Sequence, residues 1–170
     1  MGEPAEILNT TTIKRNEAIR FASLTLTNLE FIEDAWRMRQ GHVGKPVHLV
    51  TQAMNSLLGL AVFTCEKEYV RFTLKERVAD LVADGWPSWT ITLGGSPDDT
   101  LGELVYHLRN GAAHARIAFS SDSPVPSEVQ ITFEDAYPKT KQVYWRASIT
   151  AADLLTFCHR FAKHVDDVIG

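Results

Sequence analysis

The chain has 170 residues, of which 45% are hydrophobic and 22% are charged. These values are typical of a globular protein and exclude a disordered chain, and the length favours a single domain over residues 1–170. The formal net charge of −4 at pH 7 argues against a surface that coats nucleic acid non-specifically, so contact with a nucleic acid would need a local site.

The cysteines and the apolar runs indicate where such a chain resides. Cys65 and Cys158 are far apart and show no disulfide-framework spacing, so both are expected to be reduced core residues. The first twelve residues lack the basic-then-apolar pattern of a signal peptide, and the apolar run 57–63 is too short to cross a bilayer. We therefore expect a cytoplasmic protein without a membrane partner.

The first half of the chain reads mainly as helices. Apolar residues at spacings of three and four predict helices over residues 15–40 and 47–65, separated by a glycine- and proline-containing break at 41–46. A shorter helix is predicted over 73–85, where a T-x-x-E capping-box pattern opens it. Residues 89–93 alternate with period two and are expected to form a short strand or an extended loop.

The second half combines two helices with extended segments. Ser96-Pro97-Asp98-Asp99 provides the polar cap, the proline and the acidic residues that favour the start of a helix. Three extended pieces follow that helix, at 116–119, 129–133 and 143–149, and Thr150–Asp153 then caps the last helix. These elements predict a mainly α fold, a helical bundle with a small antiparallel β insertion at about 116–149, before the last helix.

The segment 104-LVYHLRNGAAHARI-117 carries an unusual polar face. On a helical wheel, one stripe is apolar and predicted to be buried, comprising Leu104, Val105, Leu108, Ala112 and Ala115. The opposite side gathers Tyr106, His107, Asn110 and His114, and Arg109 flanks the stripe. This polar side is either a solvated surface or a face for a ligand or partner. Lys and Glu are missing from it, and its small neighbours Gly111 and Ala113 favour close approach.

The arrangement Arg109-Asn110-(three residues)-His114 resembles the signature of the HEPN superfamily, in which an arginine is followed by a polar residue and by a histidine four to six positions beyond the arginine. The resemblance covers about a dozen residues in motif and most of the chain in layout. It implies a HEPN-like helical bundle with the motif near the start or end of a late helix, and some HEPN proteins carry a β insertion just after it.

The resemblance also implies an activity, that of a metal-independent endoribonuclease whose composite site forms at a homodimer interface. Arg109, Asn110 and His114 would then be the catalytic residues: the arginine binds phosphate, the histidine moves a proton, and Asn110 holds the imidazole or a phosphate oxygen. His107, Tyr106 and Arg116 would contact substrate. The expected partners are RNA and a second copy, and a toxin or defence role would add an antitoxin or other regulatory partner. No metal or cofactor is expected.

Two other functional interpretations stay open from the sequence. A non-catalytic HEPN module would bind a nucleotide, RNA or a partner protein through Arg109. A purely structural dimer would pack through Gly111 and Ala113. Metal-free turnover of RNA would distinguish the ribonuclease from both of these interpretations. The effect of replacing Arg109 on RNA binding would distinguish the binding module from the structural dimer.

Several further patterns are weaker indications of a functional site. The second R-x4-H pattern, from Arg37 to His42, has Met38 at its second position and is broken by a glycine. His107 and His114 would be about 10.5 Å apart along a helix, too far for one zinc ion without other segments. His164 and the pair Glu134–Asp135 are expected to be solvated.

Overall fold

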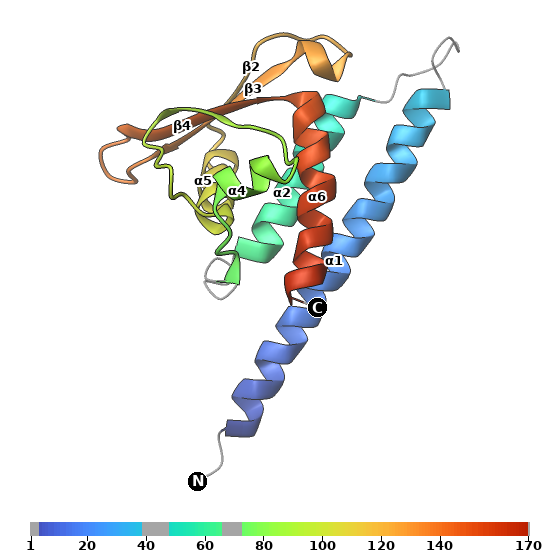
Figure 1. Cartoon of the computed structure of the whole chain (residues 1–170), viewed down its shortest axis with the longest axis vertical. Helices are drawn as coiled ribbons and strands as arrows, with labels where there is room; N and C mark the ends of the chain where they lie inside the picture. Colours follow the sequence, from blue (N-terminus) through green and yellow to red (C-terminus); the bar gives the residue numbers. More distant parts are fainter. Residues whose placement is uncertain (1–3, 39–47, 66–72, 170) are drawn as a thin grey trace.

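A computed structural model describes residues 4–38, 48–65 and 73–169, with side chains placed over 17–38, 48–62 and 73–168. Its elements follow each other along the chain as α1 (Pro4–Met38), α2 (Leu49–Cys65), α4 (Val78–Ala83), β1 (Thr90–Leu93), α5 (Leu101–Ala113), β2 (Ile117–Phe119), the 3₁₀ turn η1 (Pro126–Glu128), β3 (Gln130–Ala136), β4 (Val143–Thr150) and α6 (Ala151–Ile169). The predicted mainly α fold with a small antiparallel sheet before the last helix is confirmed (Figure 1).

Three helices, α1, α2 and α6, pack against one another (Figure 1). Their shared core is apolar and includes Leu29, Leu57, Leu60, Phe157 and Phe161. The helix predicted over residues 15–40 begins earlier than expected, at Pro4, and is described as far as Met38. Its N-terminal part extends away from the other helices in Figure 1. The break predicted at 41–46 lies outside the described residues.

The sheet has four antiparallel strands in the order β1-β4-β3-β2. The central pair places Phe133 opposite Ala147, and β1 joins the other edge of β4 with Thr90 opposite Ser148. Residues 89–93 therefore contribute a strand rather than a loop. Because β1 comes before α5, the sheet is more than an insertion between α5 and α6, which corrects the predicted extent of 116–149.

The short helix α4 begins later than its sequence pattern predicted. It starts at Val78, after Arg77, whose side chain makes no capping hydrogen bond. The residues before it are extended because they pair with the start of α5: the Leu101 amide donates to the Glu76 carbonyl at 2.8 Å. Leu74 is fully buried there. Tertiary pairing and burial have overridden the local capping preference.

The start of α5 is also shifted. Its N-cap is Thr100, which forms a capping box with Glu103, whereas Ser96 was predicted to cap this helix. Ser96 instead opens a turn in which its amide donates to the Asp99 carboxylate at 2.8 Å. The cap predicted at Thr150 is confirmed, because the Asp153 amide donates to the Thr150 hydroxyl at 3.0 Å.

The cysteine and membrane expectations are tested only in part. Cys158 is a free, fully buried thiol, and burial raises its pKa. The Cys65 side chain lies outside the described residues. Within the described part of the chain, no helix has both the length and the apolar character needed to cross a bilayer.

Candidate functional site

Helix α5 lies against the sheet, and glycine at position 111 makes this close packing feasible. Gly111 is buried, and a Cβ atom added there would lie 2.9 Å from the carbonyl oxygen of Glu134 on β3. Of the predicted buried stripe, Leu104, Val105 and Leu108 are almost completely buried, whereas Ala112 is half-buried and Ala115 lies beyond the end of α5 and is exposed, so the prediction is wrong for these two alanines. The small residue at 111 therefore serves contact within the chain, which corrects its expected role in approach by a partner.

His107 is anchored to a carboxylate from the sheet. Its Nδ1 atom lies 2.9 Å from the Oδ2 atom of Asp135, the penultimate residue of β3, and only 3% of the Asp135 side chain is exposed. Its ring also stacks on Trp145, with 4.8 Å between centroids and an interplanar angle of 18°. Both contacts fix the ring, so His107 is held against the sheet and only 20% of its side chain is exposed.

Asn110 links the motif arginine to the same carboxylate. The Asn110 amide nitrogen donates to Asp135 Oδ2 at 3.0 Å, and its oxygen accepts a hydrogen bond from Arg109 Nη1 at 3.2 Å. Asn110 was expected to hold the His114 imidazole or a phosphate oxygen. In this chain its amide is already engaged on both sides, and it orients the guanidinium instead.

A third side chain, Tyr144 on β4, completes the network. Its hydroxyl donates to Asp135 Oδ2 at 2.6 Å, and the Ala136 amide donates to Oδ1 at 2.8 Å. Burial by itself raises the pKa of Asp135, but the hydrogen bonds from Tyr144, Asn110 and His107 outweigh it and hold the pKa below its ordinary value. The pKa of Tyr144 is raised, first by burial and then by its bond to Asp135. Asp135 is therefore an ionised acceptor at neutral pH.

Asp135 is the site residue that sequence reasoning missed, and the prediction that Glu134 and Asp135 are both solvated is wrong. Glu134 pairs with Arg146 at 2.7 Å, while Asp135 is buried. A usable signal was present in the sequence. Ile131 and Phe133 alternate on the buried face of the strand, and Asp135 is the next position on that face.

The other predicted site residues lie at the edges of this network. His114 is the C-cap of α5 and is exposed, and its ring forms no hydrogen bond with any described residue. The Tyr106 ring meets the His107 ring edge-on at 5.6 Å. Arg116 follows the helix, and its Nη1 atom and the Arg109 Nε atom are both buried without a hydrogen-bond partner among the described residues. Each arginine thus retains donor capacity.

The geometry brings the predicted residues together unequally. His107, Asn110 and Arg109 share one hydrogen-bonded network with Asp135, whereas His114 is about 7.5 Å from Arg109 along the helix axis and outside that network. Within the described residues of this chain, therefore, the guanidinium is positioned and the His114 imidazole has no hydrogen-bond partner.

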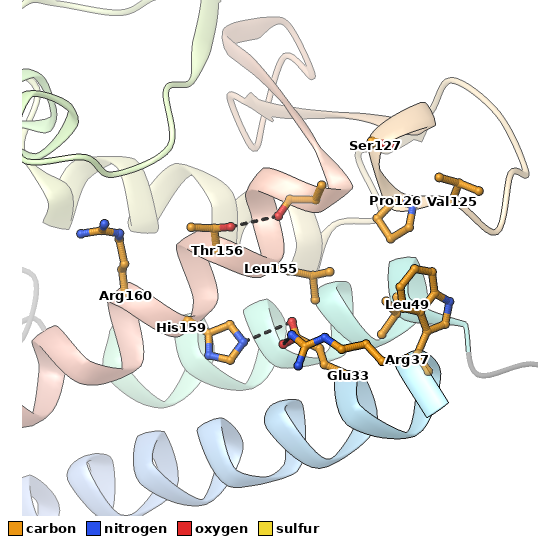
Figure 2. A pocket seen from close by; sticks show the side chains of 12 residues that line it. Glu33, Arg37, Leu49, Val125, Pro126, Ser127, Leu155, Thr156, His159 and Arg160 are labelled. Atoms are coloured by element: carbon orange, nitrogen blue, oxygen red, sulfur yellow. Dashed lines mark hydrogen bonds and ion pairs between the residues drawn. The ribbon is translucent and has the colours of Figure 1, made fainter. Parts of the chain in front are cut away.

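A separate cavity of about 600 Å³ lies between α1, α6 and η1, remote in sequence from the motif helix (Figure 2). Glu33, Arg37 and His159 in its lining are paired with one another, and Arg160 donates to the Asp84 carbonyl at 3.5 Å. Figure 2 shows His159 directed at Glu33, with 3.2 Å between Nε2 and Oε1, and the guanidinium of Arg37 also lies 3.5 Å from Glu33. Arg37, the start of the rejected second motif, is thus an ion-pair residue at the end of α1.

His164 was expected to be solvated, and this prediction is wrong. Only 17% of its side chain is exposed, its ring meets Trp86 edge-on, and its Nε2 atom lies 3.4 Å from Glu76. Over the parts of the chain that the structure describes, no group of three or more His, Cys, Asp or Glu side chains is arranged to hold a metal ion.

A helical bundle with a sheet, and with R-N-x3-H at the end of a helix packed on that sheet, has the architecture of a HEPN protein. The comparison with protein families agrees: the family described as HEPN pEK499 p136 matches residues 1–169. The chain therefore belongs to this HEPN family, and HEPN domains are generally associated with nuclease and other RNA-related functions. No curated protein and no solved structure matches the chain significantly.

Proposed function

We propose that this protein is a metal-independent endoribonuclease whose composite site forms where the α5 helices of two copies meet. The observation that carries the proposal is the motif geometry. Arg109 is oriented by Asn110, which is itself fixed by a buried carboxylate, and the exposed His114 ring stands at the end of the same helix. This chain belongs to a HEPN family across almost its whole length.

The chemistry uses a nucleophile that RNA carries itself. His114 of one copy takes the proton from a ribose 2′-hydroxyl, and the 2′-oxygen attacks the adjacent phosphorus. The bond from phosphorus to the 5′-oxygen breaks as the equivalent His114 of the second copy donates a proton to that oxygen. The products are a 2′,3′-cyclic phosphate and a 5′-hydroxyl, so water and metal are not needed for this step.

Arg109 supplies the electrostatic part of the reaction. A guanidinium donates two parallel hydrogen bonds to phosphate oxygens and stabilises the charge that grows on them in the transition state. Arg109 Nη1 already donates to Asn110, and this contact holds the guanidinium in one orientation. The remaining N–H donors of Arg109 therefore point in a fixed direction. Asn110 therefore acts on the reaction through Arg109 and touches Asp135, not the RNA.

The test is a cleavage assay on a mixed RNA substrate in excess EDTA. His114→Ala should lose at least about a hundredfold in rate, because general acid–base catalysis contributes about 10²–10⁴-fold. His48→Ala is the matched control, since His48 is another exposed histidine beside a helix end. Folding and dimer content must match in all three proteins. Equal cleavage by the wild type and His114→Ala, or no cleavage by either, would remove the ribonuclease assignment.

One observation favours a second candidate, a non-catalytic module that binds RNA, a nucleotide or a partner protein. Each protomer offers a fixed guanidinium but a single free imidazole, which suffices for anion binding and not for paired acid and base chemistry. Binding that is lost in Arg109→Ala without any turnover by the wild type would support this module. A toxin or defence role, with a partner that restrains the activity, belongs to the ribonuclease proposal.

A further inference from the structure

The turn between β3 and β4 presents an ordered tip close to the motif network. The Tyr137 amide donates to the Gln142 carbonyl at 3.0 Å, and the Lys141 amide donates to the Tyr137 carbonyl at 2.9 Å. Lys141 has a φ of 60°, a left-handed conformation that tightens the turn. These contacts fix the backbone of the segment 137–142, which we call the β3–β4 tip.

Tyr137 offers an aromatic ring that is supported on one side and accessible on another. The residue is 51% exposed, and its ring lies 4.5 Å from that of Tyr144 at an interplanar angle of 32°. Tyr144 in turn lies 5.8 Å from the His107 ring and donates its hydroxyl to Asp135. Two ring contacts thus connect Tyr137 to the motif helix through Tyr144, whose ring is held by its hydrogen bond to Asp135.

The charges around the tip favour an anionic partner. Lys139 and Lys141 are both exposed and form no ion pair with any described residue. The nearby carboxylates are engaged: Glu134 pairs with Arg146, and Asp135 accepts hydrogen bonds from three side chains. The tip therefore carries two free positive charges beside an exposed ring, in a chain whose net charge is negative.

We propose that the β3–β4 tip is a binding site for an unpaired nucleotide of single-stranded RNA: a base stacks on Tyr137, and flanking phosphates contact Lys139 and Lys141. An aromatic ring next to lysines is the combination that binds single strands, because every base has a face to stack and every linkage has a charge. This inference rests on RNA being the ligand in the proposed function. In this arrangement the sheet binds the substrate strand and holds it beside α5.

The test measures binding separately from cleavage. A fluorescent 2′-O-methyl oligoribonucleotide cannot be cleaved by 2′-hydroxyl attack, so its anisotropy reports affinity alone. Tyr137→Ala should raise Kd by about 5–150-fold, the range for losing one stacked base, while Tyr137→Phe should stay close to the wild type. Phe119→Ala is the matched control, because Phe119 is 49% exposed on the edge strand β2, where it pairs with Ile131 near the end of β3 that lies away from the tip.

The lysines are tested through salt dependence. Each phosphate contact that is lost should lower the slope of log K against log salt by about 0.7 for a single strand. Lys139→Gln and Lys141→Gln should therefore each flatten the slope, and Lys163→Gln on α6 should not. Unchanged Kd in Tyr137→Ala, or no binding by the wild type, overturns the inference about the tip. Metal-free cleavage of unmodified RNA by the wild type would still support the proposed ribonuclease in either case.

Discussion

Asp135 Oδ2 lies 2.9 Å from His107 Nδ1, although the two residues are 28 positions apart in the chain. The contact joins the motif helix to the sheet, and Asn110 and Tyr144 donate to the same oxygen. A buried carboxylate with three side-chain donors is stable only while all of them stay in place. The sheet therefore helps to hold the motif residues of α5 in place.

Asp135→Asn should destabilise the protein. The amide has one oxygen where the carboxylate had two acceptors, so at least one buried donor loses its partner, at a cost of about 1–3 kcal/mol. For a chain of this size each kcal/mol lowers Tm by about 2–4 °C. Urea unfolding of both proteins measures the change. Glu134→Gln, which breaks only a partly exposed ion pair, should cost under about 1 kcal/mol; an equal loss in both variants would contradict the account.

The stability provided by Asp135 should depend on pH in one direction. Its pKa is lower in the folded protein than in the unfolded chain, so its contribution is fully present above the unfolded value of about 4. The contribution is lost as pH falls through the folded pKa. The difference in unfolding free energy between the wild type and Asp135→Asn should thus be constant from pH 7 to about 5 and shrink below about pH 4. A difference that grows on acidification would contradict this assignment.

Gly111→Ala should be destabilising, against the usual trend. Alanine normally stabilises a helix interior relative to glycine by about 0.5–1 kcal/mol. Here the new methyl group would lie 2.9 Å from the Glu134 carbonyl oxygen, and forcing α5 away from β3 should cost about 1–3 kcal/mol. Thermal unfolding measures the sign directly. Ala113→Ser on the exposed side of α5 is the control and should change stability by less than about 0.5 kcal/mol.

Tyr144→Phe should remove one donor to Asp135 and cost about 1.5–3 kcal/mol, because the acceptor is charged. In the Asp135→Asn background the same change should cost less. The coupling in this double-mutant cycle should be about 0.5–3 kcal/mol, as expected for residues in one hydrogen-bond network. Strictly additive losses in urea unfolding would show that the hydroxyl and the carboxylate act independently.

Patterns local to the chain predicted most of the helices and strands. The stripe on α5 and the alternation on β3 were readable because burial imposes the periods of helix and strand. The helix starts at Val78 and Leu101 could not be read this way, because the segment before α4 pairs with the start of α5 and shifts both N-caps. A capping pattern depends on neighbouring residues, so it cannot predict backbone pairing with a segment that is distant in sequence.

The same limit applies to the site. The motif residues Arg109, Asn110 and His114 are close in sequence, so their spacing was visible. The partner that fixes two neighbouring residues of α5, Asp135, comes from another element, and its type suggested solvent rather than burial. His107 was undervalued for the same reason, because its role depends on a carboxylate 28 residues away.

The chemistry of the RNA ends produced in excess EDTA distinguishes the proposed mechanism from metal-dependent cleavage. We predict that the wild type leaves 2′,3′-cyclic phosphate and 5′-hydroxyl ends, and that His114→Ala leaves neither above background. A substrate with 2′-deoxyribose at the cleaved positions should resist both proteins. Products with 3′-hydroxyl and 5′-phosphate ends, or the same ends in equal amounts from His114→Ala, would contradict the proposed mechanism.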